Sequence, residues 1–316
     1  MGGAQLTTHH LAVALAGRGH HVSVLAQAPL PDSWPRTGAP PEEYPVVEAE
    51  RPDELLGSPA HDLVVVGGYG ASSRAWTERM LAATCGSATA LYLHDVANAG
   101  LRADRRLAVS EFVAAAAGAE VLPPIVERAR YRVDTTRRAV LFVSPVAQKG
   151  LDTALALAAA RPDVPFVFQH CSRVHLRDPG PLERSAAALP NVAVRHPVAS
   201  PAELYRDARI VLAPSTYPEG FGRVVAEAQA SGIPALASDV GGLPEAAGDA
   251  AVLVPADAPV ERWLGGLARL WDDPAAYASY AARADASSRS GRLSPAVVAE
   301  RFEALAATAV PSISLT

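Results

Sequence analysis

The chain has 316 residues, of which 49% are apolar, enough for two α/β domains or one large one. Its formal charge of −5 gives no general electrostatic case for binding nucleic acid, and no run of 18 or more apolar residues predicts a membrane span. Cys85 and Cys171 lack metal-ligand spacing and the N-terminus lacks the pattern of a signal peptide, so we expect a reduced, cytoplasmic protein.

The first residues predict a loop, a helix and a strand. Gly2 and Gly3 precede an apolar helical pattern that ends at residues 17–19, and residues 21–26 alternate as a strand. This is the second half of a βαβ unit whose first strand, usually central in a doubly wound sheet, is missing. We expect that the true N-terminus lies upstream, with a shortened domain as the alternative.

The next segment predicts loops, a buried strand and a glycine-containing turn into a helix. Residues 28–60 predict proline-rich loops around one short strand at 44–47, and residues 62–66 predict a buried strand that leads through Gly68 and Gly70 into a helix at 73–84. The glycine pattern is a near miss to a dinucleotide fingerprint, because its last glycine and its acidic partner are lacking.

Residues 88–93 form the next predicted strand, and His94 follows it. Ligands of open α/β sheets bind at the carboxyl ends of strands, so His94 is a candidate contact for a proton or hydroxyl; a structural histidine is the alternative. Ser110 and Glu111 suit the start of the following helix.

The middle of the chain places the only lysine at a strand-to-helix junction. The arginine-rich residues 127–138 predict a solvated linker between domains, with a polyanion-binding patch as the alternative. A strand at 139–144, a loop that ends at Lys149-Gly150 and a helix at 151–160 follow. A compact ammonium beside the free N–H groups of a helix start suits a phosphate.

Two carboxylates bracket the next such junction. Residues 210–213 predict a strand, and a turn leads to a helix expected to run from about Gly220 to Gly232. Glu219 and Glu227 are eight positions apart, or roughly 12 Å along a helix. They could therefore hold two ends of one elongated ligand, such as a nucleotide-sugar, with two solvated glutamates as the alternative.

Strands and helices continue to alternate to the end of the chain, with strands at 235–238 and 251–254 and helices at 259–271, 274–288 and 295–309. This alternation predicts an α/β protein with two Rossmann-like domains built on parallel sheets.

Three fragments that lie in order resemble the donor-site signature of family-4 retaining glycosyltransferases, which have the GT-B fold. They are Pro214-Ser-x-x-Pro-Glu219-Gly-Phe-Gly-Arg-Val-Val-x-Glu227-Ala, Ser231-Gly232-x-Pro234, and Ser238-Asp239-x-Gly241-Gly242-Leu-Pro244-Glu245. Further fragments agree along the chain: Gly2-Gly3-Ala4-Gln5, Gly19-His20-x-Val22, His94-Asp95, Val109-Ser110-Glu111-Phe112 and Lys149-Gly150-Leu151-Asp152.

The resemblance implies two Rossmann-like domains that face each other across a cleft. Residues 1–132 would form the acceptor-side domain, with the helix at about 296–316 packing back on it, and residues 139–295 the donor domain.

The resemblance also implies roles for individual residues. Lys149 would contact the donor diphosphate, Glu219 the sugar hydroxyls and Glu227 the ribose hydroxyls. Gly2 and Gly3 would form the loop that closes on donor and acceptor, and His94 would reach the donor sugar. Backbone N–H groups would hold sugar and phosphate around Gly220, Phe221, Gly222 and Arg223.

The implied activity is transfer of a hexose from a UDP-sugar to an acceptor hydroxyl with retention of configuration and without a metal or other cofactor. The acceptor could be a secondary metabolite, a saccharide or a lipid; with a lipid, the protein would lie at the membrane. Ser144-Pro145-Val146 stands where many members carry a second cation, for which Arg223 is a candidate substitute. An inactive GT-B partner subunit and a nucleotide-sugar epimerase remain alternatives, and neither the donor sugar nor the oligomeric state follows from the sequence.

Overall fold

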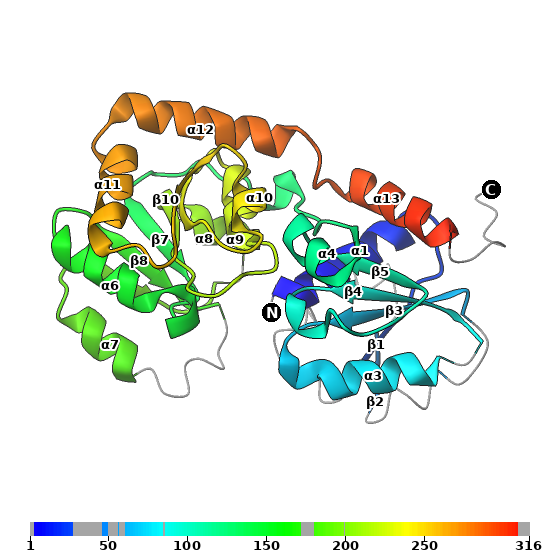
Figure 1. The fold of residues 1–316 in the computed structure, drawn as a ribbon. Coiled ribbons are helices and arrows are strands. Elements are labelled where there is room, and N and C mark those ends of the chain that lie inside the picture. The colour runs from blue at the N-terminus through cyan, green and yellow to red at the C-terminus, as the bar shows by residue number, and fades with distance from the viewer. Residues whose placement is uncertain are drawn as a thin grey trace. The chain divides into compact units, whose positions relative to one another are not determined.

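The computed structural model describes residues 3–27, 46–49, 56, 61–84, 86–171, 180–198 and 200–308. The chain divides into two compact units, one comprising residues 1–125 with 293–316 and the other residues 126–292. Each unit contains parallel strands with helices between them, which confirms the predicted α/β class (Figure 1).

The first unit contains two parallel sheets in its described part. The four-stranded sheet has the order β3 (Leu63–Gly68), β4 (Ala88–Leu93), β5 (Arg105–Ala108) and β6 (Glu120–Val121). The two-stranded sheet pairs β1 (Val24–Gln27) with β2 (Val46–Ala49). The predicted strand at 44–47 begins outside the described residues and continues into β2.

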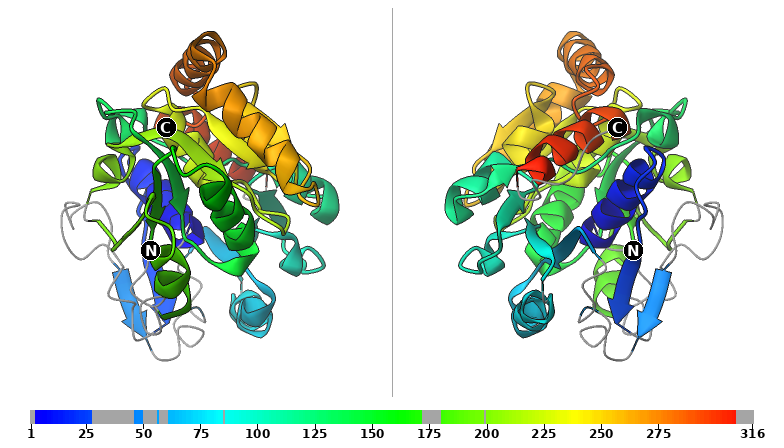
Figure 2. Two further views of the ribbon diagram at one scale, coloured as in Figure 1. Left: turned by 90° about the vertical axis from the view of Figure 1, so that its left-hand side faces the viewer. Right: turned by 90° about the vertical axis from the view of Figure 1, so that its right-hand side faces the viewer.

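The helices of the first unit include one that returns from the C-terminus. They are α1 (Gly3–Ala16), η1 (Ala71–Ser73), α3 (Arg74–Ala83), η2 (Val96–Asn98), α4 (Glu111–Ala117) and α13 (Pro295–Ala307). Figure 2 shows α13 beside α1. The two are joined where Arg18 donates two hydrogen bonds to Glu303, at 2.6 and 2.7 Å. As predicted, Ser110 caps α4, since its hydroxyl accepts a hydrogen bond from the backbone N–H of Val113.

The second unit is built on one six-stranded parallel sheet. Its order is β12 (Ala251–Val254), β11 (Ala235–Ser238), β10 (Ala208–Ala213), β7 (Ala139–Val143), β8 (Phe166–Gln169) and β9 (Val192–Arg195). The chain therefore builds outward from β7 in one direction and then from β10 in the other, which is the doubly wound arrangement. The switch point, where ligands of such sheets bind, lies between β7 and β10.

Helices connect these strands and bury the sheet. They are α5 (Arg128–Tyr131), η3 (Ala147–Lys149), α6 (Leu151–Ala160), α7 (Gly180–Ala187), α8 (Pro201–Tyr205), α9 (Arg223–Gln229), α10 (Leu243–Ala247), α11 (Val260–Trp271) and α12 (Pro274–Arg289). The core joins strand residues such as Phe142 and Leu212 to Leu157 of α6 and Trp263 of α11. All four side chains are at most 1% exposed, so the sheet and these two helices form one apolar core.

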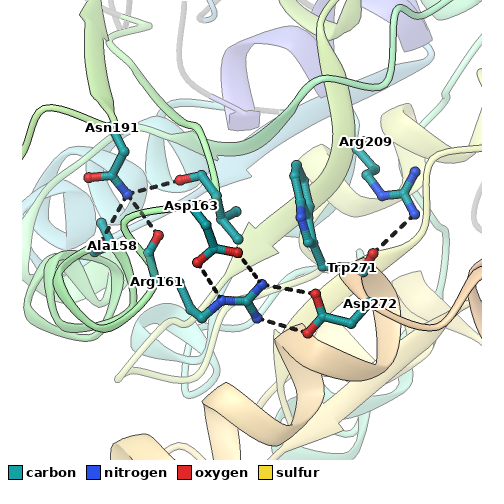
Figure 3. A network of polar contacts seen from close by, with 8 residues as sticks. Ala158, Arg161, Asp163, Asn191, Arg209, Trp271 and Asp272 are labelled. Atoms are coloured by element: carbon teal, nitrogen blue, oxygen red, sulfur yellow. Dashed lines mark hydrogen bonds and ion pairs between the residues drawn. The ribbon is translucent and has the colours of Figure 1, made fainter.

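A polar network joins the C-terminal ends of α6 and α11 (Figure 3). The guanidinium of Arg161 donates two hydrogen bonds to Asp163, at 2.7 and 2.9 Å, and two to Asp272, both at 2.9 Å. Asn191 Nδ2 donates to the carbonyls of Ala158 and Arg161, which the end of α6 would otherwise leave without helical partners. This network lies at the amino edge of the sheet, away from the switch point.

The predicted solvated linker at 127–138 is wrong in part. Residues 128–131 form α5, and Tyr131 is only 2% exposed. Arg128 is paired with Asp285 of α12 at 2.9 Å. An arginine-rich stretch resembles a solvated linker because its few apolar members, Ala129, Tyr131 and Val133, alternate with arginines, and the pattern does not reveal that the tyrosine ring is buried.

Candidate active site

Two loops meet at the switch point of the second unit. The loop of residues 144–150 follows β7, and the loop of residues 214–222 follows β10. The carbonyl of Gln148 accepts hydrogen bonds from both the backbone N–H and the hydroxyl of Thr216, at 3.1 and 3.3 Å. Gly150 has a φ of +82°, and a Cβ there would lie 1.9 Å from the carbonyl oxygen of Pro214. The two loops can therefore approach this closely only with glycine at position 150.

Lys149 and Glu219 form an ion pair at this junction. Lys149 Nζ lies 2.7 Å from Glu219 Oε2, and the hydroxyl of Ser215 donates to Oε1. The ammonium also lies 5.4 Å from the ring centre of Tyr217. Burial alone would lower the pKa of Lys149, but Glu219 and Tyr217 together outweigh it and the pKa is raised. The lysine is therefore a charged group at physiological pH, held ready beside a carboxylate that is only 7% exposed.

A third loop, after β11, supports the segment that carries Glu219. The backbone N–H of Gly242 donates to the carbonyl of Glu219 at 2.8 Å. A Cβ on Gly241 would lie 2.4 Å from that carbonyl oxygen, and one on Gly242 would lie 2.3 Å from the carbonyl oxygen of Gly220. The glycine pair in the third sequence fragment therefore lets this loop pack directly against the backbone at Glu219 and Gly220.

Glu227 has its own set of partners, separate from that of Glu219. Its Oε2 accepts a hydrogen bond from the hydroxyl of Tyr205 at 2.8 Å, and its Oε1 accepts one from Arg223 Nε at 3.1 Å. Arg223 Nη2 in turn donates to the hydroxyl of Tyr131 at 3.2 Å. The guanidinium of Arg223, a candidate second cation for a diphosphate, is thus engaged with Glu227 and Tyr131.

Burial and the Glu227 carboxylate together shift the pKa values of the side chains in this network. Burial, followed by the nearby Glu227 carboxylate, raises the pKa of Tyr131 to about 12 and places that of Tyr205 well above its ordinary value. Burial alone would lower the pKa of Arg223, but Glu227, Tyr131 and Tyr205 together outweigh it and raise the pKa. Both phenols therefore stay protonated and Arg223 stays charged at physiological pH.

The helix between the two glutamates is shorter than predicted. It begins at Arg223 rather than near Gly220, because Gly222 has a left-handed backbone with φ of +94° and serves as the N-cap residue. Gly220 and Phe221 consequently belong to the loop, and Phe221 is 4% exposed. The spacing of roughly 12 Å assumed eight helical residues and does not apply to a segment that is half loop.

In the first unit, His94 follows β4 at the carboxyl edge of the sheet, as predicted. Its backbone N–H donates to the carbonyl of Gly68 at 2.8 Å, and its ring contacts that of Tyr92 at a tilt of 46°, with 4.7 Å between the ring centres. The adjacent Asp95 accepts a hydrogen bond from the backbone N–H of Gly70. Gly3 begins α1 and is exposed, and Gly2 lies outside the described residues.

Sequence reasoning missed the hydroxyl partners of the two glutamates. Ser215 stands inside the recognised fragment, so its place beside Glu219 could have been suggested from the sequence. Tyr205 stands in a short helix with no motif around it, and nothing in the local pattern predicts its bond to Glu227.

Neither a membrane-spanning helix nor a metal-ligand cluster occurs among the described residues. None of the described helices is long and apolar enough to cross a bilayer. Within the same part of the chain, no group of three or more His, Cys, Asp or Glu side chains is placed to bind a metal ion.

Comparison with known families and proteins agrees with this geometry. Residues 137–273 match the family model "Glycosyl transferases group 1". A D-inositol 3-phosphate glycosyltransferase of Segniliparus rotundus is 39% identical over 160 residues, which cover 46% of this chain and 35% of that protein. The chain therefore spans about a third of the length of this curated relative.

Solved structures share the fold over nearly the whole chain. Alr3699/HepE of Anabaena, solved in complex with UDP and glucose, has a TM-score of 0.79 and 18% identity, covering 97% of this chain and 96% of that one. AviGT4, a glycosyltransferase involved in avilamycin A biosynthesis, has a TM-score of 0.68 and 22% identity, covering 98% and 91%. These matches confirm the resemblance found in the sequence: the chain has the GT-B fold, and its residues 137–273 match the group 1 glycosyltransferase model.

Proposed function

We propose that the chain is a retaining, metal-independent glycosyltransferase that moves a sugar from a nucleoside-diphosphate donor, with UDP as the nucleotide, to an acceptor hydroxyl. The observation that carries the proposal is the Lys149–Glu219 ion pair, which lies at the switch point of a doubly wound sheet beside the separately held Glu227. Open α/β sheets bind their ligands at this point.

Lys149 is the proposed contact for the donor diphosphate. Without ligand, its charge is balanced by Glu219 at 2.7 Å. A diphosphate carries more negative charge than a carboxylate and would compete for the ammonium. As the glycosyl–phosphate bond breaks, negative charge grows on the leaving phosphate, and a fixed cation there stabilises the transition state more than the ground state. A protein cation in this place is the basis for proposing that no metal is needed.

The two glutamates are proposed to hold the two ends of the donor. Glu219 would accept hydrogen bonds from sugar hydroxyls, and Glu227 from the ribose hydroxyls. Their separate partners support this division, because neither carboxylate shares a donor with the other. They are therefore a poor template for the paired carboxylates of glycoside hydrolases. Retention would follow if the acceptor attacks on the face from which the nucleotide leaves, as the family resemblance implies.

The remaining roles rest on the resemblance alone. We propose that backbone N–H groups of residues 220–223 contact the sugar and phosphate, that Gly2 and Gly3 contact donor and acceptor, and that His94 contacts the donor sugar.

The relatives indicate which substrates to assay first. Alr3699/HepE was solved with UDP and glucose, which makes UDP-glucose the first donor. The curated relatives are named for D-inositol 3-phosphate, which makes that cyclitol phosphate the first acceptor, followed by saccharide and lipid alcohols.

The test combines nucleotide binding with turnover. We expect wild-type protein to bind UDP in calorimetry and to transfer sugar with the anomeric configuration retained, as read by NMR of the product. Lys149→Ala and Glu219→Gln should each lower turnover by orders of magnitude, while the protein stays folded and keeps a cooperative melting transition. Arg262→Ala, which removes an exposed cation from α11, is the control for loss of one positive charge.

Several results would contradict the proposal. Wild-type rates in both Lys149→Ala and Glu219→Gln would overturn the site assignment. Nucleotide binding without turnover of any donor would favour an inactive GT-B protein, and formation of an epimer without acceptor would favour an epimerase.

A further inference from the structure

Each of the two site carboxylates is held by one hydroxyl and one cation. Glu219 is bound by Ser215 and Lys149, as described above. Glu227 is bound in the same manner by the hydroxyl of Tyr205 and the guanidinium of Arg223. Ser215 is part of the recognised fragment, whereas Tyr205 comes from a different helix, 22 positions away from Glu227.

The contact between Tyr205 and Glu227 is buried and well formed. Tyr205 is 0% exposed and Glu227 is 7% exposed. The hydroxyl lies 2.8 Å from Oε2, the length of a normal O–H···O bond, and 3.4 Å from the carbonyl of Val224. The ring of Tyr205 packs edge-on against that of Tyr131, with ring centres 6.4 Å apart, so the hydroxyl has a fixed position.

We propose that Tyr205 is a positioning residue for donor recognition, which fixes the carboxylate of Glu227 so that its remaining lone pairs meet the ribose hydroxyls. This inference rests on the proposed function and adds to it a residue outside the recognised fragments.

The physical reason is the freedom of a glutamate side chain. A carboxylate has about four acceptor sites, of which Tyr205 and Arg223 occupy one each, and the others remain for the donor. Glu227 lies on α9, and its terminal torsion is soft unless both oxygens are held. Arg223 holds one oxygen only. Removing the hydroxyl of Tyr205 frees the other and allows the carboxylate to turn away from the ribose.

Removing the Tyr205 hydroxyl should weaken binding of the nucleotide and leave the chemical step largely unchanged. The sugar and leaving-group contacts belong to Glu219 and Lys149, which have other partners, so kcat should change little while KM for the donor rises. Loss of one hydrogen bond to a charged group corresponds to about a tenfold change in affinity.

The experiment compares ribonucleotides with 2′-deoxyribonucleotides. For wild-type protein and Tyr205→Phe, calorimetry gives Kd for UDP, GDP and ADP and for their 2′-deoxy forms. Wild type should bind the tightest ribonucleotide better than its deoxy form, because the site hydrogen-bonds the missing hydroxyl. Tyr205→Phe should bind the ribonucleotide about tenfold more weakly and the deoxynucleotide nearly as well as wild type does, so that discrimination falls.

Two further variants give the experiment its controls. Tyr277→Phe removes another largely buried phenol hydroxyl of the same unit, one that donates to the carbonyl of Arg209 at 3.2 Å, and should leave discrimination unchanged. Glu227→Gln should lower discrimination as Tyr205→Phe does, and adding Tyr205→Phe to it should cost little more, since both changes act on one contact.

The outcomes separate this inference from the proposed function. If wild type binds no nucleoside diphosphate, the proposed function fails and the inference with it. If wild type discriminates against deoxynucleotides and Tyr205→Phe does so equally, the inference is overturned and the proposed function stands. An equal loss of affinity for both forms would also overturn it, since that is the result of general damage to the unit.

Discussion

Replacing Gly150 with alanine tests whether the close approach of the two site loops is essential. A Cβ at this position would lie 1.9 Å from the carbonyl oxygen of Pro214, whereas ordinary contact begins at 3.4 Å. The loops would have to separate by about 3.4 − 1.9 = 1.5 Å. Since Lys149 is the preceding residue, the displacement would move the proposed diphosphate contact.

The control substitution must impose the same backbone strain without a steric overlap of the new Cβ, and Gly118→Ala does so. Gly118 and Gly150 both have left-handed conformations, with φ and ψ of 58° and 46° and of 82° and 40° respectively. The nearest atom to a Cβ on Gly118 is Arg106 Nη2, the end of a flexible side chain, at 3.5 Å. The backbone term of about 1 kcal/mol is therefore common to both substitutions.

The expected difference in melting temperature between the two variants comes only from the steric overlap of the new Cβ with Pro214. Gly118→Ala should lower the melting temperature by about 2–4 °C, the effect of about 1 kcal/mol on a domain of this size. Gly150→Ala should add about 1–3 kcal/mol for overpacking, for a total shift on the order of 10 °C. Turnover should also fall by about 100-fold, since misplacement of a catalytic contact by about 1 Å has this effect.

Circular dichroism melting, UDP calorimetry and initial rates on the two variants provide the measurement. Equal melting temperatures and equal UDP affinities for Gly150→Ala and Gly118→Ala would refute the packing argument. A rate loss in Gly118→Ala as large as that in Gly150→Ala would assign the effect to backbone strain instead.

Two further predictions concern ion pairs outside the site. The hydrogen bonds from Arg18 lower the pKa of Glu303 from 4.5 to about 2, so the stability that this contact contributes is present above about pH 4.5 and is lost as the pH falls towards 2. The melting temperature of wild type should therefore exceed that of Glu303→Gln at pH 6, and the difference should shrink below pH 4.5. Arg161→Ala should cost about 1 kcal/mol, because its partners Asp163 and Asp272 are half-exposed, and should leave UDP affinity unchanged.

Glu300→Gln and Arg161→Lys serve as comparison variants for these two predictions. Glu300→Gln removes an exposed acid from the same helix as Glu303 and should show no such pH-dependent difference. Arg161→Lys keeps the charge but cannot form two bidentate contacts, so its melting temperature should lie between those of wild type and Arg161→Ala. The assignment of Glu303 would be contradicted if the difference in melting temperature between wild type and Glu303→Gln stayed constant from pH 6 to pH 2. The assignment of Arg161 would be contradicted by an altered UDP affinity in Arg161→Ala.

The sequence by itself determined the class of fold and the residues to examine. Strand and helix periodicity is a local property, so the alternation that produces parallel sheets could be read directly, as could the serine that caps α4 at Ser110. The positions of Lys149 and Glu219 after strands also followed from local pattern, and the doubly wound order then brought their two loops to one edge.

The tertiary structure decided which groups hold those residues in place. The bond of Tyr205 to Glu227 and the packing of Gly242 on the Glu219 loop join segments about twenty residues apart, across different strands. The burial of Tyr131 turned an expected linker into part of a core. Such contacts depend on how elements pack in three dimensions, and a single sequence records each partner without recording that they meet.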